Sequence, residues 1–328
     1  MAPRTEADMW ADHKNEKALP VSKVDLTGKT IIITGANVGL GFEAAKHFAM
    51  MNPKKMILAV RDEAKGLAAA KEIGYAAAES VTTFADRVGR ELERLDILLL
   101  NAGLAAFEYR LTEDGYESML QVNDLSNLLL GIRLAPLLLK TAKENGTVSR
   151  LVNVSSEAFY FTEIDSLIAE SKDNIYKAMS SKDYCVPPAW FGRYPQSKLI
   201  ELFYTRSLQA HVGKDAPLVV TCLNPGFCYS SLRRDVTGPM KDKFEAQEKE
   251  YAYTTEEGSR QLVFGAVGGD PDELKGEYFS MCKVREVSDY ALSEEGFKAE
   301  RRFWDDGIEI LEGADAKFKT ALQSIAKV

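Results

Sequence analysis

The chain has 328 residues, of which 45% are apolar and 27% charged, so it can bury a full core and is not intrinsically disordered. Its net charge of −8 argues against nucleic acid or an anionic membrane surface as the main partner. Four cysteines without a C-x-x-C spacing and three scattered histidines argue against a disulfide scaffold or a metal site, and the expected location is cytoplasmic.

The first 25 residues are expected to form a polar N-terminal extension. They are mixed in charge and lack the apolar core of a signal peptide. The most apolar run elsewhere, residues 125–139, is interrupted by Gly131, Arg133 and Pro136, which predicts a buried helix and no membrane span.

From residue 26 onward, short apolar strands alternate with helical stretches. The predicted strands are 29–34, 55–60, 96–100, 150–154, 218–223 and 276–280. Near-continuous apolar strands separated by helices indicate a parallel sheet that is covered on both faces. We therefore predict an α/β fold with a doubly wound parallel sheet of the Rossmann type, forming a single domain over residues 26–328.

The third strand of such a sheet is expected to be missing or vestigial. Only residues 73–78 (IGYAAA) lie between the helices predicted at 62–72 and 79–93. Six extended residues span about 20 Å, which leaves no room for a strand and two turns. This strand lies at the sheet edge, so its loss need not destroy the core, but it shortens the adenine-binding half.

A glycine-rich segment, TGANVGLG at residues 34–41, follows the first strand and opens a helix. Glycines there permit a tight turn and let the backbone approach a pyrophosphate, which the N–H groups of the helix N-terminus can hold. The alternative is a glycine-rich turn without a ligand, and the preceding strand favours the cofactor interpretation. The candidate cofactor-binding residues in this loop are Gly35, Asn37, Gly39, Leu40 and Gly41.

A second motif pairs Tyr194 with Lys198, four residues later on a predicted helix whose first turn contains Pro195. Both side chains then share one helix face. A neighbouring ammonium favours the phenolate and brings the tyrosine pKa, about 10 when free, closer to neutral pH. Taken alone, however, most such pairs are ordinary helix-surface residues.

Five motifs in order resemble the short-chain dehydrogenase/reductase superfamily over about residues 26–280. They are TGANVGLG, Asn101-Ala102-Gly103, Ser155-Ser156, Tyr194/Lys198 and Asn224-Pro225-Gly226. The segments AVRDEAKG, RLVNVSS and SKLIELFYT are most similar to the retinol-dehydrogenase-like group and its fungal secondary-metabolism relatives.

The resemblance implies a set of catalytic roles. Tyr194 would be the general acid toward a carbonyl or the base toward an alcohol, and Lys198 would hold the nicotinamide ribose and lower the Tyr194 pKa. Ser156 would donate a hydrogen bond to the substrate oxygen, whereas Ser155 would be structural. Asn123 would support a proton-relay water, and the alternative of a buried polar residue bonded to backbone is compatible with that role. The remaining implied cofactor contacts are Asn101, Ala102, Gly103, Pro225, Gly226 and, in place of a family threonine, Ser230.

Cofactor choice is predicted from the end of the second strand. Families that prefer NAD(H) place an acidic residue there, whereas this chain has Val60 followed by Arg61. A guanidinium matches the geometry and charge of a 2′-phosphate, so we expect NADP(H) in preference to NAD(H). Asn37 could add a donor, and the adjacent Asp62 can point away as a helix N-cap.

The substrate side is expected to comprise an insertion at 157–193 and a lid at 229–253. Seven aromatic residues in the insertion suggest an enclosed apolar pocket for a bulky lipophilic carbonyl or alcohol. They could equally anchor the insertion to the core. The insertion is also expected to cover the helices at 124–143 and 195–211, which favours a monomer over a homodimer. We predict an NADP(H)-dependent oxidoreductase; the alternative is an impaired nucleotide-binding or regulatory scaffold with a shortened adenine half.

Overall fold

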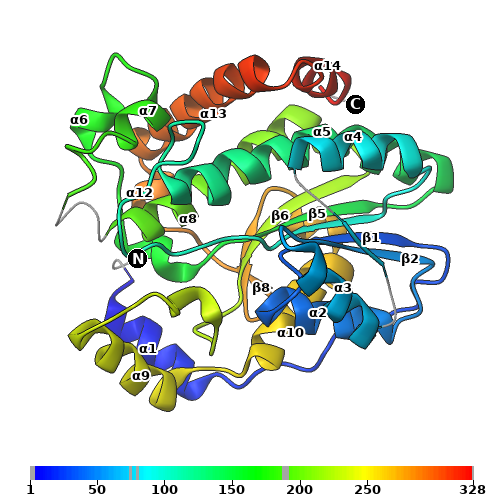
Figure 1. Cartoon of the computed structure of the whole chain (residues 1–328), viewed down its shortest axis with the longest axis horizontal. Helices are drawn as coiled ribbons and strands as arrows, with labels where there is room; N and C mark the ends of the chain where they lie inside the picture. Colours follow the sequence, from blue (N-terminus) through cyan, green and yellow to red (C-terminus); the bar gives the residue numbers. More distant parts are fainter. Residues whose placement is uncertain (1–3, 74–75, 79–80, 187–191, 327–328) are drawn as a thin grey trace.

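A computed structural model describes residues 4–73, 76–78, 81–186 and 192–326 (Figure 1). Its centre is one sheet in the order β3-β2-β1-β4-β5-β6-β7-β8, in which every neighbouring pair is parallel except β7 and β8. The strands are β1 Thr30–Thr34, β2 Lys55–Ala59, β3 Ala76–Ala78, β4 Ile97–Leu100, β5 Ser149–Val154, β6 Leu218–Asn224, β7 Tyr278–Ser280 and β8 Lys283–Val284. The predicted doubly wound parallel sheet is confirmed.

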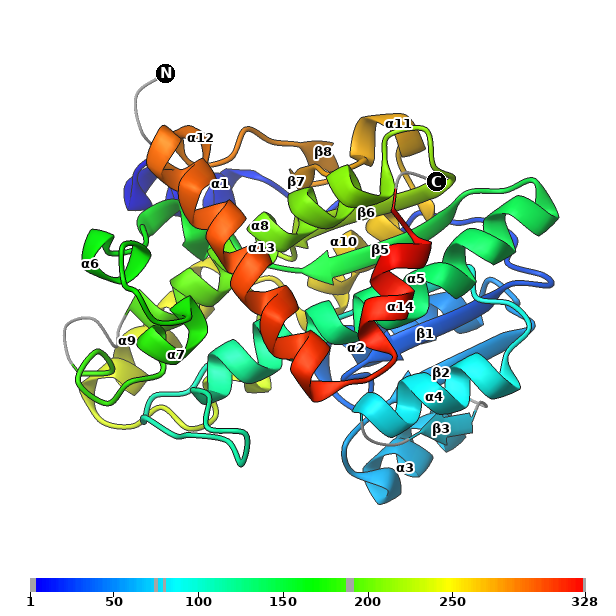
Figure 2. The same ribbon diagram turned by 90° about the horizontal axis from the view of Figure 1, so that it is seen from above.

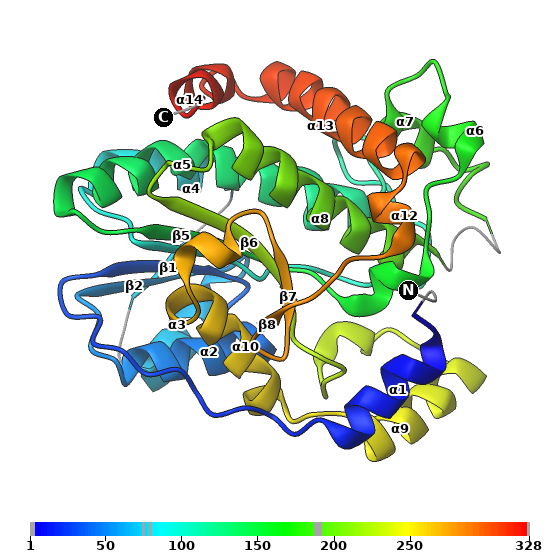
Figure 3. The ribbon, with the colours of Figure 1, turned by 180° about the vertical axis from the view of Figure 1, so that it is seen from behind.

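Helices cover both faces of this sheet (Figures 1 and 3). One face carries α2 (Gly39–Ala49), α3 (Glu63–Ile73) and α10 (Thr255–Val267). The other carries α4 (Val81–Glu91), α5 (Ser126–Asn145) and α8 (Arg193–Val212). Strands β1, β4, β5 and β6 are buried along their whole length because both faces are covered.

The third strand is present but only three residues long. Ala76 pairs with Ile57 and Ala78 with Ala59, so β3 extends the sheet beside β2. The strand is thus vestigial rather than missing, and the estimate that residues 73–78 leave no room for it was wrong. It fits because three residues suffice for the strand and α4 begins only at Val81.

The apolar stretch around residues 125–139 lies in a core helix, as predicted. Together with the π-helical turn η1 (Leu120–Leu125), α5 forms a helix long and apolar enough to cross a membrane, but 72% of its most apolar window is buried inside the structure.

The outer faces of α5 and α8 are covered by the C-terminal helices α13 (Glu294–Ala314) and α14 (Phe318–Ser324). Helix α13 lies along α8, and α14 lies along α5 (Figure 2). Leu199 and Phe203 are fully buried as a result. The expectation that the insertion alone forms this cover was therefore wrong: the 3-10 helix η2 (Glu157–Phe161) of the insertion packs on α8, but α13 and α14 supply the rest of the cover. From the insertion, α7 (Ile175–Met179) contributes Tyr176, whose ring packs against Phe303 of α13.

The N-terminal extension contains a helix, α1 (Glu6–Asn15), which lies beside α9 (Pro239–Tyr251) of the expected lid (Figures 1 and 3). Short elements complete the described chain: η2 Glu157–Phe161, α6 Ser166–Ala169, η4 Ser231–Arg233, α11 Pro271–Leu274 and α12 Asp289–Leu292.

Candidate active site

The glycine loop joins β1 to α2 and packs tightly against the end of β4. Gly35 has a φ of +65°, and a Cβ there would lie 3.0 Å from the Cα of Ala102. A Cβ on Gly41 would clash with the Asn101 side chain and lie 2.9 Å from the Gly35 oxygen. The N-cap residue Val38 forms no side-chain hydrogen bond, so the N–H groups of the first turn of α2, from Gly39 onward, can hold a pyrophosphate. The loop therefore fits a dinucleotide.

Asn101 and Ala102 are fixed beside this loop by Thr34, the last residue of β1. The backbone N–H groups of both residues donate to Thr34 Oγ1 at 2.9 Å. Asn101 Nδ2 donates to the Thr34 oxygen at 2.9 Å and to the Gly35 oxygen at 3.2 Å. The structure thus brings the predicted residues after β4 against the glycine loop. Thr34 was not predicted as the residue that joins them.

Tyr194 and Lys198 share one face of α8, as their spacing predicts. Helix α8 begins at Arg193, which places Tyr194 in its first turn. The Lys198 ammonium lies 5.7 Å from the centroid of the Tyr194 ring. Lys198 is buried and Tyr194 half-buried, so the ammonium lies beside the tyrosine ring at a partly enclosed position.

The Lys198 ammonium is held by two further groups. It donates to the Val154 oxygen at 2.9 Å and to Glu201 Oε1 at 2.8 Å, one helical turn away. Burial opposes the charged form of Lys198, but Glu201 and Tyr194 more than offset it, so the Lys198 pKa is raised. Burial also raises the pKa of Glu201 from 4.5 to about 7, against the lowering effect of Lys198.

Asp124 completes this buried charged group. Its side chain is fully buried, and neither carboxyl oxygen has a hydrogen-bond partner among the described residues. Burial, assisted by the Glu201 carboxylate, raises the Asp124 pKa well above its usual range. Neither Glu201 nor Asp124 was predicted as a site residue from the sequence. The position of Glu201, three residues after Lys198, was the one sequence feature that indicates a pairing of these two side chains.

Asn123 lies in the π-helical turn η1 beside Lys198. Its Nδ2 donates to the Leu104 oxygen at 3.0 Å and to Ser197 Oγ at 2.9 Å, and its Oδ1 accepts from the Leu104 N–H at 2.9 Å. These bonds match the alternative of a buried polar residue bonded to backbone. A Cβ on Gly103 would lie 3.4 Å from Asn123 Oδ1 and 3.6 Å from Lys198 Nζ, so these three residues meet at one point.

The two serines after β5 have different environments. Ser155 is buried, and its hydroxyl donates to the Lys198 oxygen at 2.8 Å, which agrees with a structural role. Ser156 is half-buried and caps η2 by accepting from the Ala158 N–H at 3.2 Å. A hydroxyl that accepts one bond still has its own hydrogen to donate, so Ser156 can bind a substrate oxygen.

After β6, Pro225 and Gly226 form the turn that leads to η4. Ser230 caps this short helix by accepting from the Leu232 N–H at 3.0 Å. The thiol of Cys228 donates to the Pro225 and Gly226 oxygens at 3.4 and 3.3 Å. Burial raises the Cys228 pKa to about 12, so this cysteine packs rather than reacts.

Arg61 follows β2 at the carboxyl edge of the sheet and is exposed. The Lys65 N–H donates to Asp62 Oδ1 at 3.1 Å, so Asp62 caps α3 as expected. Its carboxylate is engaged with the helix rather than with a nucleotide site. Asn37 is half-buried in the glycine loop.

Four aromatic residues of the insertion fall into two groups, and a fifth, Tyr184, lies under the Arg193 guanidinium, 5.2 Å from the ring centroid. Phe159 and Tyr176 are fully buried and anchor the segment to the core. Tyr160 and Phe161 line a cavity of about 730 Å³ whose walls are charged as well as aromatic, unlike the apolar pocket expected. Trp190 and Phe191 lie outside the described residues.

A doubly wound sheet with a glycine loop after β1, and a buried lysine beside a tyrosine on α8, defines a dinucleotide-binding protein of the dehydrogenase class. Residues 29–166 match the family model described as short chain dehydrogenase. The short chain dehydrogenase/reductase dmxR8 of Cryptosporiopsis sp. is 35% identical, over 90% of this chain and 94% of its own length. The short-chain dehydrogenase anuD of Penicillium roqueforti is 31% identical, over 89% of this chain and 80% of its own.

Solved structures agree with this fold. The 3-ketoacyl-(acyl-carrier-protein) reductase from Brucella melitensis, solved as a complex with NADH, superposes with a TM-score of 0.57 at 20% identity, over 78% of this chain and 97% of its own. An uncharacterized protein from Mycobacterium paratuberculosis reaches a TM-score of 0.62 at 24% identity, over 88% and 95%. The chain belongs to the short-chain dehydrogenase/reductase family, whose members are nicotinamide-dependent oxidoreductases.

Proposed function

We propose that this protein is an NADP(H)-dependent oxidoreductase that interconverts a carbonyl and an alcohol on a bulky lipophilic substrate, with Tyr194 as the general acid or base. The observation that carries the proposal is the buried Lys198 ammonium 5.7 Å from the Tyr194 ring. A nearby positive charge favours the phenolate, and so helps a tyrosine to act as a general acid near neutral pH.

The proposed reaction needs few groups from the protein. The nicotinamide supplies or accepts the hydride when bound. In reduction, the Tyr194 hydroxyl donates its proton to the carbonyl oxygen while the Ser156 hydroxyl donates a hydrogen bond to the same atom. Lys198 stabilises the resulting phenolate. Alcohol oxidation uses the same groups in reverse, with Tyr194 as the base.

The dinucleotide would lie along the carboxyl edge of β1, β4 and β5. Gly39, Leu40 and Gly41 would hold the pyrophosphate with their N–H groups. The remaining contacts we propose are Gly35, Asn37, Asn101, Ala102, Gly103, Pro225, Gly226 and Ser230. Exposed Arg61 supports NADP(H), because a guanidinium at this position can pair with the 2′-phosphate.

The segment 229–253, with α9 as its main element, would be the lid. The cavity of about 730 Å³ is large enough for a bulky substrate, within the usual range of about 300–1,000 Å³. The alternative, an impaired scaffold with a shortened adenine half, is not favoured, because β3 still extends the sheet beside β2 and relatives that match over most of the chain are short-chain dehydrogenases.

Titration of the purified protein with NADPH, followed by fluorescence, tests the proposal. We expect micromolar affinity and weaker binding of NADH. Absence of binding at millimolar NADPH would overturn the proposed function. NADH binding as tightly as NADPH would overturn only the choice of cofactor.

A further inference from the structure

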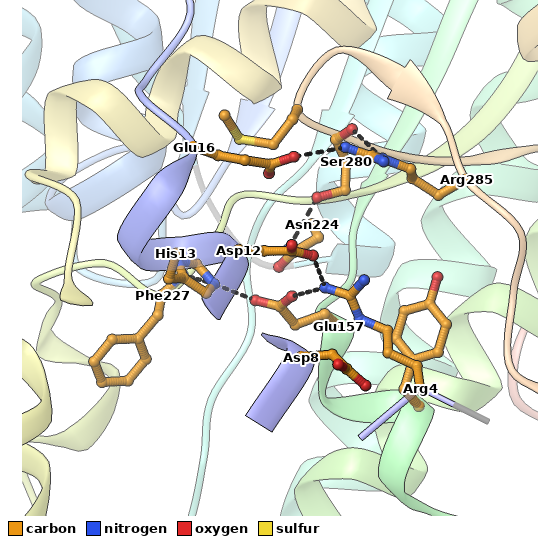
Figure 4. Close-up of polar contacts among 12 residues, drawn as sticks. Arg4, Asp8, Asp12, His13, Glu16, Glu157, Asn224, Phe227, Ser280 and Arg285 are labelled. Atoms are coloured by element: carbon orange, nitrogen blue, oxygen red, sulfur yellow. Dashed lines mark hydrogen bonds and ion pairs between the residues drawn. The ribbon is translucent and has the colours of Figure 1, made fainter. Parts of the chain in front are cut away.

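The N-terminal helix α1 closes one side of the cavity of about 730 Å³ (Figure 4). The opposite walls come from η2 and from the ends of β6 and β7. Two lining residues connect the cavity to the candidate active site: Glu157 directly follows Ser156, and Gly226 is a proposed nicotinamide neighbour. The cavity therefore reaches the segments after β5 and β6 that carry Ser156 and Gly226.

Helix α1 is firmly seated in this position. The Trp10 ring packs edge-on against Phe227, with centroids 5.2 Å apart, and lies 4.9 Å from the Tyr251 ring of α9. The Tyr253 hydroxyl donates to the Glu16 oxygen at 2.9 Å. These contacts make α1 a fixed wall of the cavity and join it to the proposed lid.

His13 of α1 contacts the segments that follow β5 and β6. Its Nε2 lies 2.5 Å from Glu157 Oε1, and its Cε1 lies 3.2 Å from the point where a Cβ of Gly226 would be (Figure 4). The side chain is 5% exposed. Because His13 touches the residues after both β5 and β6, it shapes the space between them.

Two polar atoms on cavity-lining residues have no partner. Neither His13 Nδ1 nor the Tyr278 hydroxyl forms a hydrogen bond with any described residue, although both side chains are more than nine-tenths buried. Buried polar groups without partners cost free energy, and both atoms are closed off from solvent, so His13 and Tyr278 form an incompletely hydrogen-bonded part of the cavity wall.

The lining carries an excess of negative charge. Seven lining residues are Asp or Glu, and only two are Arg. Arg4 pairs with Asp12 at 2.7 Å and Arg285 with Glu16 at 3.0 Å, which leaves an excess of five acidic residues over arginines in the lining. Five aromatic rings line the same space, from Tyr160, Phe161, Tyr253, Tyr278 and Tyr290. Such walls repel anions, accept hydrogen bonds from hydroxyl or amine groups and pack against ring systems.

We propose that this cavity is the substrate chamber, that it takes uncharged or cationic ring ketones with donor groups and rejects carboxylates and phosphates, and that α1 supplies His13 as a specificity-determining residue. This inference rests on the proposed oxidoreductase function and adds the substrate class.

The charge preference is tested with two bicyclic aryl ketones that differ at one ring position, a hydroxytetralone and the matching carboxytetralone. NADPH oxidation gives kcat/KM for each. We expect kcat/KM for the hydroxytetralone to exceed kcat/KM for the carboxytetralone by about tenfold, because the negative charge of the walls opposes docking of the anion. Glu163 and Glu286 are exposed and line the cavity. The double variant Glu163→Gln/Glu286→Gln should lower the ratio of the two kcat/KM values about threefold, the usual scale for exposed charges. The control Glu144→Gln/Glu294→Gln, outside the cavity, should leave the ratio unchanged.

The role of His13 is tested by His13→Ala against Lys14→Ala on the same helix. We expect the His13 variant to weaken hydroxytetralone binding to the NADP⁺ complex about tenfold in calorimetry, with NADPH affinity unchanged, and the Lys14 variant to have no effect. The Trp10 emission, obtained by subtracting the spectrum of a matching Trp10→Phe variant, shows whether α1 stays docked in His13→Ala. If α1 undocks, the substrate chamber is tested by the charge variants alone.

Failure of the inference and failure of the proposed function give different results. If NADPH binds normally but kcat/KM is equal for the two ketones, or neither ketone binds, the cavity is not the proposed substrate chamber. Loss of NADPH binding itself would instead overturn the oxidoreductase.

Discussion

The buried pair of Lys198 and Glu201 makes a prediction about stability that requires no substrate. Burial raises the Glu201 pKa from 4.5 in the exposed state to about 7 in the fold, a difference worth about 3 kcal/mol. Folding therefore favours the protonated carboxyl. The stabilising contribution is fully present below pH 4.5 and is lost as the pH rises through about 7.

Glu201→Gln removes this titration. We expect the free energy of unfolding of the variant, relative to the parent protein, to rise by about 3 kcal/mol between pH 4.5 and about pH 7.5. The Lys198 pKa falls once its partner is neutral, and this acts in the same direction. Urea unfolding across this pH range measures the difference, in which titrations common to both proteins cancel.

Glu144→Gln is the control, because Glu144 is exposed, and its difference should stay flat with pH. A flat difference for Glu201→Gln would mean that Glu201 titrates as an ordinary surface carboxyl, and a falling one that folding lowers its pKa; either result would refute the reasoning.

Four further predictions concern catalysis, cofactor and assembly. Tyr194→Phe should lower turnover at least about a hundredfold with NADPH affinity nearly unchanged, and retention of most activity would contradict the acid role. Arg61→Ala should weaken the binding of NADPH more than that of NADH in titrations; equal losses of affinity would mean that Arg61 does not bind the 2′-phosphate. Gly41→Ala should weaken NADPH binding and lower the Tm, because its Cβ would lie 2.9 Å from the Gly35 oxygen, and an unchanged Kd would argue against close packing of the loop. In sedimentation at micromolar concentration we expect a monomer of 36.4 kDa, since α13 and α14 already cover α5 and α8, and a particle of twice that mass would refute this.

The predictions from sequence succeeded where the pattern was local. The run KTIIIT followed by glycines specified β1, the loop and α2, because a buried strand and a tight turn each have a residue signature. The positions of Tyr194 and Lys198 followed from helical periodicity in the same way.

Tertiary docking was beyond the sequence. Thr5 and Asp8 form a capping box that was a readable start signal for α1, but nothing local indicates that this helix brings His13 to Glu157. The C-terminal helices were likewise not predicted to cover α5 and α8. An amphipathic pattern shows which side of a helix is buried, but not the element against which it packs. The partners of Asn123 show the same limit, because they come from separate elements of the chain.

The cover provided by α13 and α14 has a consequence for synthesis. During translation α5 and α8 emerge well before the helices that shield them, so Leu199 and Phe203 remain in contact with solvent or a chaperone until the last elements arrive. A message that ends before Glu294 yields a chain that can still form β1 to β6 but leaves this apolar face open. Such products are prone to aggregate, so only chains that include α13 and α14 keep this apolar face covered.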